Sequence, residues 1–449
     1  MRLIIRYLSP LFRSRRRFSF FAFISLLLCI AFILFLIDYN HSLSIPRNNT
    51  ENKLITKSIS TTQNKGLWPI DKKGRSLKTK FLVLDLTGFF GSGASEGAQV
   101  QCSSSNTTFI WTRRQDRIEE IDFIISHDAR NLNDALLSKI QLNNVKQQYT
   151  MAYVMESEVH SSTGDPWKMY NFKMTYNLDD SYPEPATYFD TNIHIIDLLK
   201  PPTISFEDKE PDADIVWIIS NCNAHNGRED FIKELMKEIK IDSYGPCLNN
   251  RHGYEARMTD NVDAYMKYKF VIAIENSNCI DYVSEKLVKA VESGSIPIVA
   301  GRNNRPDYRR YMPEHSYINI FDYKSVKALA DDLKRIANNQ TLYESYLWYK
   351  NHKVNIEELP EYSLEEKLKH LANVIGSKAT MITQGIAGKE KSENKVCKLI
   401  RFVRQTPWQT IAAHQGTPRA DASTACLPND HILTHFSVPS ANISQTEQS

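Results

Sequence analysis

The sequence predicts an α/β protein with two domains, each built around a parallel sheet that helices cover on both faces. Two observations predict this class. Six short apolar segments of β-forming residues recur, and segments with helical spacing separate several of them. A proline-rich, charged stretch at residues 200–212 then interrupts the alternation. With 449 residues, 42% hydrophobic and 24% charged, the chain has the length and the ordinary globular composition for two domains.

The first element along the chain is an apolar run at residues 18–37 that carries no charge. As a helix it would extend about 30 Å, the thickness of a bilayer core. Arginines at 13, 15, 16 and 17 precede it, so residues 1–17 are expected in the cytosol and the rest in the lumen, as a type II signal-anchor. A cleaved signal peptide is the alternative, but the run is long for one and no small-residue cleavage motif ends it.

Residues 38–78 are rich in Ser, Thr, Asn and Lys, which predicts an extended stem. Lumenal placement gives meaning to the glycosylation sequons at Asn40, Asn48, Asn106, Asn339 and Asn442. We expect modification at Asn48, Asn106 and Asn339, because Asn40 lies close to the membrane and Asn442 lies in the tail. An oxidising lumen also favours disulfides, in a pairing that the sequence does not determine. The cysteines concerned are Cys102, Cys222, Cys247, Cys279, Cys397 and Cys426.

The segments expected as strands are 81–86, 121–126, 149–156, 214–220, 269–275 and 295–301. Helices are expected at 229–240, 282–292 and 325–338. The break at 200–212 separates residues 79–205 from residues 206–376, and we predict one domain in each. Ligands of parallel sheets bind beyond the carboxyl ends of the strands, so the active site is expected between the two domains. Residues 377–449 lose the alternation and are expected to form an irregular tail.

The stretch from Lys269 to Gly301 concentrates polar groups where a strand ends and a helix begins. Asp281 is expected to cap this helix. A helix N-terminus attracts phosphate through its free N–H groups and its dipole. Lys286 adds a positive charge in the first turn, and Glu285 can accept hydrogen bonds from sugar hydroxyls. The alternative is an ordinary strand-helix-strand unit with a solvated Glu-Lys pair.

A resemblance makes this site specific. ENSNCIDYVSEK followed by SIPIVAG resembles the signature of the α1,3-fucosyltransferase family, glycosyltransferase family 10. IVWIISNCNAHNGREDFIKEL, IDSYGPC and RPDYRRYMPEHSYINIFDY resemble its other elements, in the same order, within residues 81–348. The resemblance implies a GT-B fold of two facing Rossmann-like domains, GDP-fucose as donor and inversion at the transferred sugar. The donor contacts that it implies are Arg228, Asn276, Tyr282, Glu285 and Lys286.

The resemblance also implies a catalytic base. Inverting transfer needs a group that takes the proton of the acceptor hydroxyl. Glu156 follows a predicted strand at the point where the family carries its candidate base, in a Glu-Ser-Pro sequence. Glu158 replaces the proline here, so either glutamate remains a candidate, and Glu156 is preferred. The alternative for Glu156 is an ordinary solvated carboxylate at the end of a strand. Tyr176 is expected in the acceptor cleft or in the core, and His127 in a structural role.

No tightly bound cofactor is expected, and Mn or Mg is expected at most to stimulate the reaction. Asp212 and Asp214 form a D-x-D, but they precede a strand instead of following one. Zinc is disfavoured because the spacing is irregular and lumenal thiols oxidise. The residues that a zinc site would use are Cys222, His225, Cys247 and His252.

The C-terminus departs from the family, which often ends in a Cys-x-x-Cys pair. Cys397 is kept, but Ile400 stands where the second cysteine would fall, and a weaker second domain is expected.

The sequence therefore predicts a Golgi type II membrane enzyme that moves L-fucose from GDP-β-L-fucose to GlcNAc of glycoprotein glycans in α1,3 linkage. The sequence leaves the acceptor open between the proximal core, the distal core and a Lewis-type GlcNAc. The resemblance implies an invertebrate core-type or a Lewis-type member of the family. With 55 basic and 52 acidic residues, the charge gives no support to a nucleic-acid partner. Two alternatives are another nucleotide-sugar transferase of the same fold and a catalytically degenerate, lectin-like member.

Overall fold

The computed structural model describes residues 68–88, 93–129, 132, 148–188, 200–252, 261–350, 394–414 and 416–437. The expected membrane span at residues 18–37, most of the stem, and the sequons at Asn40, Asn48 and Asn442 lie outside these ranges. Within them, no helix combines the length and the apolar character that crossing a bilayer requires.

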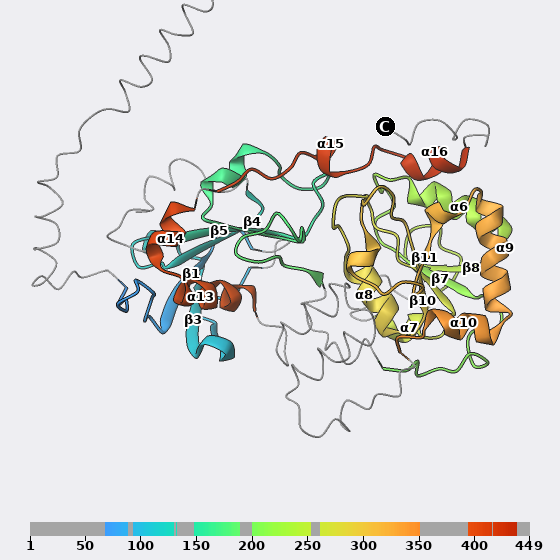
Figure 1. Ribbon diagram of the computed structural model, residues 1–449, viewed down its shortest axis with the longest axis horizontal. Coiled ribbons are helices and arrows are strands. Elements are labelled where there is room, and N and C mark those ends of the chain that lie inside the picture. The colour runs from blue at the N-terminus through green and yellow to red at the C-terminus, as the bar shows by residue number, and fades with distance from the viewer. Residues whose placement is uncertain are drawn as a thin grey trace, which may run out of the picture. The chain divides into compact units, whose positions relative to one another are not determined.

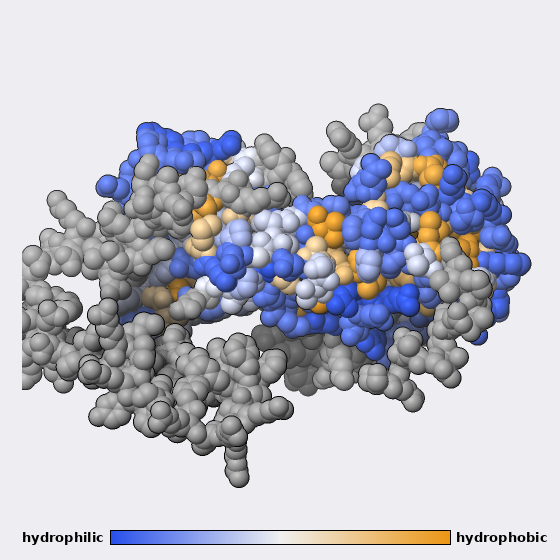
Figure 2. Space-filling view, turned by 90° about the horizontal axis from the view of Figure 1, so that it is seen from above, coloured by the Kyte–Doolittle hydropathy of each residue, from blue (hydrophilic) through white to orange (hydrophobic). Residues whose placement is uncertain are grey.

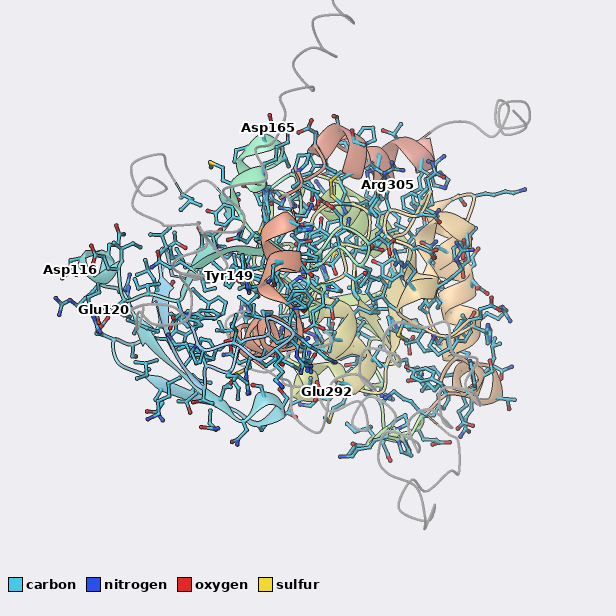
Figure 3. All side chains as sticks on the ribbon, turned by 60° about the vertical axis from the view of Figure 1, so that its left-hand side comes forward. Asp116, Glu120, Tyr149, Asp165, Glu292 and Arg305 are labelled. Atoms are coloured by element: carbon cyan, nitrogen blue, oxygen red, sulfur yellow. A yellow bond between two sulfur atoms is a disulfide. The ribbon has the colours of Figure 1, made fainter. Side chains whose placement is uncertain are left out.

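A six-stranded sheet occupies the first part of the described chain, in the order β2-β3-β1-β4-β5-β6. Its strands are β1 (Lys80–Asp85), β2 (Gln99–Cys102), β3 (Thr107–Thr112), β4 (Phe123–His127), β5 (Tyr149–Val154) and β6 (Phe172–Thr175). The β2 and β3 strands pair antiparallel, and the other neighbours pair parallel. Tyr149 of β5 (Figure 3) packs on Trp68 and Phe172 with ring centroids 5.6 and 5.7 Å away, so aromatic contacts fill one face.

A second, fully parallel sheet of five strands follows, in the order β11-β10-β9-β7-β8. Its strands are β7 (Ile215–Ile218), β8 (Ile241–Tyr244), β9 (Phe270–Ile272), β10 (Ile296–Val299) and β11 (Ile318–Asn319). Its helices are α6 (Arg228–Glu238), α7 (Val262–Tyr265), α8 (Glu285–Glu292), α9 (Val326–Ala337) and α10 (Gln340–Tyr346). The α7 and α8 helices share one apolar cluster with the sheet, and α6, α9 and α10 share another, so helices cover both faces (Figure 1).

The predicted alternation of strands and helices is confirmed, since each of the six expected apolar segments contains a strand. The helix expected at 282–292 begins later, at Glu285, because Ser284 and not Asp281 is its N-cap. Asp281 has a left-handed φ of 60° and forms an ion pair with Arg310 at 2.8 Å. Glu285 and Lys286 are therefore the first two residues of α8.

The expectation of an irregular tail is wrong for residues 394–437. They form four helices, α13 (Lys395–Gln405), α14 (Trp408–Ala413), α15 (Ala422–Ala425) and α16 (His431–Ser437). Figure 1 shows α13 beside β1 and β3, where Leu399 and Ile400 are fully buried in the core of the first sheet. Ile400 thus fills part of this core, and α13 supports the first sheet, not the second.

The six cysteines expected in disulfides are paired as Cys102–Cys397, Cys222–Cys247 and Cys279–Cys426. The Cys222–Cys247 bond removes both thiols from any zinc site. Asp214 lies just before β7 and pairs with Lys269 at 3.0 Å. The face in Figure 2 is mostly hydrophilic, and the large hydrophobic side chains exposed among the described residues are Ile70, Leu77 and Ile110.

Candidate functional site

A buried carboxylate organises the loop between β9 and α8. Glu275 is 1% exposed, and its Oε1 accepts the N–H of Ser284 at 2.7 Å. Its Oε2 accepts the Ser284 hydroxyl at 2.7 Å and the Lys286 ammonium at 3.1 Å. Every buried charge needs such partners, since an unpaired carboxylate in this position would be costly. Glu275 therefore fixes both the start of α8 and the position of Lys286.

Lys286 is a permanently charged group at this site. Its Nζ also donates to the Ser284 hydroxyl at 2.8 Å and to Glu285 at 3.4 Å. Burial opposes the charge, but the carboxylates of Glu275 and Glu285 outweigh burial and raise the pKa of Lys286 to about 12. Burial likewise opposes ionisation of Glu285, and the Lys286 charge prevails and lowers the pKa of Glu285. Both side chains are ionised at neutral pH.

The start of α8 is not the bare anion site that the sequence suggested. The amide of Ser284 is bonded to Glu275, and the amide of Lys286 lies 3.4 Å from the Ser284 hydroxyl. Attraction for an anion at this helix end therefore comes mainly from the ammonium of Lys286 and less from free N–H groups.

Arg228, the first residue of α6, is 1% exposed and ties two strand ends together. It donates to the carbonyl oxygens of Ile274 after β9 at 2.7 Å and Asn221 after β7 at 3.0 Å. Its Nε contacts Glu229 at 3.1 Å. A guanidinium has five N–H groups, so these contacts leave donors for a further acceptor. Arg228 bonds the backbone of Ile274, and Lys286 bonds the side chain of the next residue, Glu275, so the two cations meet the same strand end.

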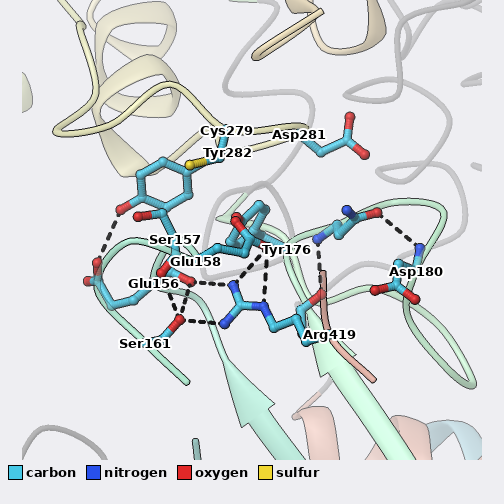
Figure 4. A network of polar contacts seen from close by, with 12 residues as sticks. Glu156, Ser157, Glu158, Ser161, Tyr176, Asp180, Cys279, Asp281, Tyr282 and Arg419 are labelled. Carbon is cyan, nitrogen blue, oxygen red and sulfur yellow. Dashed lines mark hydrogen bonds and ion pairs between the residues drawn. The ribbon is translucent and has the colours of Figure 1, made fainter. Parts of the chain in front are cut away.

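Two hydrogen bonds join the loop after β9 to the loop after β5. Ser277, next to the half-buried Asn276, donates to the hydroxyl of Ser157 at 2.7 Å. The hydroxyl of Tyr282 donates to Oε2 of Glu156 at 3.2 Å (Figure 4). Burial and the Glu156 charge raise the pKa of Tyr282 well above its usual value, so this tyrosine stays protonated and donates. The predicted base and the predicted donor residue Tyr282 are thus in direct contact.

The structure separates the two candidate glutamates. Glu158 is 4% exposed, accepts a hydrogen bond from Tyr176 and pairs with Arg419 at 3.1 Å. Glu156 is less buried and keeps its carboxylate beside Tyr282. Tyr176 is itself 1% exposed, so of the two expectations for Tyr176 the core position is confirmed. Of the two glutamates, Glu156 is thus the more accessible.

Sequence reasoning missed Glu275 as the organiser of the site, and it also missed Tyr188. Burial first, and then the charges of Glu285, Glu156 and Glu275, raise the pKa of Tyr188 far above its usual value. Its hydroxyl therefore lies within the electrostatic reach of all three carboxylates. No motif surrounds Tyr188 in the sequence, so no local signal could have identified it. His127, at the end of β4, packs edge-on against Tyr153 with ring centroids 6.3 Å apart.

Two further features of the described residues resemble binding sites. Glu158, Cys279 and Cys426 cluster within ligand distance, but the two sulfur atoms are bonded to each other. A polar pocket of about 330 Å³ lies beyond β10 and β11, between Gly301 and Asp322, and none of the predicted site residues lines it. The sequon residues Asn106 and Asn339 are both exposed.

Comparison with known proteins gives a family match over the second sheet and part of the C-terminal segment. The profile described as "Glycosyltransferase family 10 (fucosyltransferase) C-term" matches residues 208–407. Among solved structures, "Crystal Structure of alpha1,3-Fucosyltransferase with GDP-fucose" is similar with a TM-score of 0.47 and 16% identity. That likeness covers 80% of this chain and 95% of the other.

Three curated relatives match over shorter stretches. Alpha-(1,3)-fucosyltransferase B of Drosophila melanogaster is 38% identical over 155 residues, 32% of this chain and 34% of the relative. Glycoprotein 3-alpha-L-fucosyltransferase A of Drosophila melanogaster is 30% identical over 250 residues, which are 52% of this chain and 47% of the relative. 4-galactosyl-N-acetylglucosaminide 3-alpha-L-fucosyltransferase 9 of Cricetulus griseus is 31% identical over 189 residues, which are 42% of this chain and 49% of the relative. The chain thus spans between about a third and a half of the lengths of these relatives.

Proposed function

We propose that this chain is an α1,3-fucosyltransferase that moves L-fucose from GDP-β-L-fucose to GlcNAc of glycoprotein glycans, because residues 208–407 match the glycosyltransferase family 10 model and its curated relatives are named fucosyltransferases. The new linkage is α1,3 and the transfer inverts the anomeric centre. The observation that carries the proposal is the contact between Tyr282 and Glu156, which puts a carboxylate from the first sheet beside the family's signature loop.

The cations of the second sheet suit a nucleotide diphosphate. Charge develops on the GDP oxygens as the bond to fucose breaks, and fixed positive groups that meet this charge lower the barrier. Lys286 is held by Glu275 with its ammonium at the start of α8, and Arg228 lies nearby with its guanidinium fixed by backbone carbonyls. Neither side chain has to reorganise before the reaction. Asn276 and Glu285 lie on the same loop and helix start, where they can bond the sugar and ribose hydroxyls.

Glu156 is the proposed general base. In an inverting displacement, the acceptor hydroxyl attacks the anomeric carbon as its proton passes to a base on the acceptor side. Glu156 comes from the first sheet, opposite the cations of the second, so the attacking and leaving oxygens are served by different sheets. The Tyr282 hydroxyl orients the carboxylate. The rest of the carboxylate can accept the proton.

The decisive experiment compares donors and acceptors on the full chain. The purified enzyme is offered GDP-fucose, GDP-mannose and UDP-sugars with an array of glycans that carry core, distal and antennary GlcNAc. We expect transfer from GDP-fucose alone, and a loss of about 10²- to 10⁴-fold in kcat for Glu156→Gln. Transfer from a UDP-sugar in place of GDP-fucose would favour the related nucleotide-sugar transferases. Binding of glycans without transfer would favour the lectin-like alternative.

The acceptor, the compartment and the membrane arrangement are part of the same proposal. The predicted signal-anchor at residues 18–37 and the three disulfides support a lumenal enzyme held in the Golgi membrane. The relatives from Drosophila favour a glycoprotein glycan as acceptor, since one of them is named a glycoprotein 3-alpha-L-fucosyltransferase. Mass spectrometry of the fucosylated product identifies which GlcNAc carries the new residue.

A further inference from the structure

Residues 416–427, which we call the strap, lie beyond residue 407, where the family match ends. The strap contacts the first sheet at its beginning. Arg419 and Gly164 exchange two backbone hydrogen bonds, of 2.8 and 3.3 Å. At Gly416 an added Cβ would lie 2.5 and 2.6 Å from two backbone oxygens, so a side chain larger than hydrogen does not fit there. The beginning of the strap is thus packed closely against the segment that follows β5.

The strap is joined to the signature loop at its other end. Cys426 is bonded to Cys279, and the amide of Leu427 donates to the carbonyl oxygen of Asn278 at 2.8 Å. Arg305, labelled in Figure 3, donates to the carbonyl oxygen of Thr424 at 2.9 Å. The strap therefore connects the segment after β5, which carries Glu156, to the loop that carries Tyr282.

Arg419 lies in the middle of these contacts (Figure 4), with 2% of its surface exposed. Its Nη2 donates to the backbone oxygen of Glu156 at 2.7 Å. Nη2 and Nε lie 3.1 and 3.2 Å from Oε1 of Glu158. Its Nη1 donates to the hydroxyl of Ser161. Nη1 also lies 3.4 Å from the backbone oxygen of Ser162, so one buried guanidinium holds four residues of the loop at 156–162, including the backbone of the proposed base.

We propose that Arg419 is a positioning residue for Glu156: it fixes the backbone of the 156–162 loop and so places the Glu156 carboxylate beside Tyr282. The inference rests on the proposed function, because it assigns to Arg419 a role in the reaction that Glu156 serves. It extends the catalytic unit to a segment outside the family match.

The choice of residue type supports positioning over stability alone. Burying an arginine and a glutamate together removes both from water, and an apolar pair of similar volume is often at least as stabilising. An apolar pair cannot bond the Glu156 oxygen and the Ser161 hydroxyl. The guanidinium is planar with donors in fixed directions, which the single ammonium of lysine does not reproduce. A shift of 1 Å in a reacting group costs about 100-fold in rate, so a rigid loop has a direct kinetic value.

The test is Arg419→Lys, which keeps the charge and removes the fixed geometry, with Arg401→Lys as the matched control. Arg401 lies in α13, away from the loop, and pairs with Glu184 at 3.0 Å. For Arg419→Lys in the full chain, we expect kcat to fall by about tenfold or more, and KM for GDP-fucose to stay within about twofold. Amide hydrogen exchange should rise in peptides that cover residues 156–162. Arg401→Lys should leave all three quantities as in the wild type.

Unchanged exchange at residues 156–162 in Arg419→Lys, or a kcat that falls only with the folded fraction, would overturn the inference. A wild type that transfers no fucose to any acceptor refutes the proposed function separately. The exchange result then still decides whether Arg419 holds the loop.

Discussion

The hydroxyl of Tyr282 donates to the carboxylate of Glu156 across 3.2 Å. A hydrogen bond to a charged group is worth about 1.5–3 kcal/mol, so it can hold the carboxylate in one orientation. The Tyr282 ring also packs against the Tyr176 ring, with centroids 4.9 Å apart, and is 2% exposed. The ring keeps its place without the hydroxyl, and the orienting effect can therefore be tested alone.

Tyr282→Phe removes the hydroxyl and keeps the ring. We expect kcat to fall by about 10- to 100-fold, with a smaller change in KM for GDP-fucose, because the base loses its orienting donor. Steady-state kinetics with GDP-fucose and the best glycan acceptor measure both quantities. Tyr343→Phe is the matched control. Tyr343 lies buried in α10, and its hydroxyl is 3.4 Å from the backbone oxygen of Gly294. An equal loss of kcat in both variants would count against the orienting role.

Lys286→Met removes the cation at the start of α8 and keeps a side chain of similar length. We expect kcat/KM for GDP-fucose to fall by about 100-fold or more, as the leaving diphosphate loses a fixed positive partner. Lys289→Met changes a lysine of the same helix in its last turn and should leave kcat/KM close to the wild-type value. GDP inhibition constants for the three proteins distinguish lost donor binding from misfolding. A Lys286→Met enzyme that still binds GDP at wild-type strength would contradict a direct contact with phosphate.

The unit from β9 through α8 to β10 could be predicted from the sequence because each part carries a local signal. The apolar residues of β9 are continuous, and those of α8 keep helical spacing and end at Gly294. The role of Glu275 could not be predicted. A glutamate after a strand is usually solvated, and only its contacts with Ser284 and Lys286 make it a buried organiser. The sequence also predicts the start of α8 too early, because the contact of Glu275 with Ser284, which fixes that start, has no local signal.

The strap had no local signal. Its one described helix, α15, has four residues, and disulfide and hydrogen bonds hold the segment in place of an apolar stripe. Arg419 contacts Glu158 and Glu156 across 261 and 263 positions of sequence. A pairing of this separation depends on the whole fold, so neither periodicity nor a short motif can reveal it.

Asn339 gives a test of lumenal exposure that does not disturb the fold. It is the N-cap of α10, and its Oδ1 accepts the Leu342 amide at 3.0 Å, so replacing it would also remove a cap. Thr341→Ala removes the sequon and leaves the cap in place. We expect the chain expressed in a secretory host to lose the mass of one N-glycan, with an unchanged unfolding midpoint. An identical mass for wild type and Thr341→Ala would mean that this sequon is unused.

We expect His431 to make the docking of α16 sensitive to acid. The ring is 8% exposed, stacks on Phe321 with centroids 5.7 Å apart, and donates from Nδ1 to the Pro428 oxygen at 3.0 Å. Burial is the main cause that lowers the pKa of His431 to about 4, and the charge of Arg302 and the neighbouring His225 and His435 add to it. The fold therefore holds this histidine neutral.

The sign of the pH effect follows from linkage. The folded pKa lies below the unfolded value of about 6.5, so the contribution of His431 to stability is complete above pH 6.5. It declines as the pH falls toward 4, by about 3 kcal/mol in total.

His431→Phe keeps the stacking on Phe321 and cannot take up a proton. We expect its unfolding midpoint to fall less than that of the wild type between pH 7.5 and 4.5. The other histidines are present in both proteins, so the difference between the two curves isolates His431. His315→Phe changes an exposed histidine whose ring lies tilted against the Tyr346 ring, and this variant should keep the wild-type slope. Parallel curves for wild type and His431→Phe would show that His431 does not set the acid sensitivity.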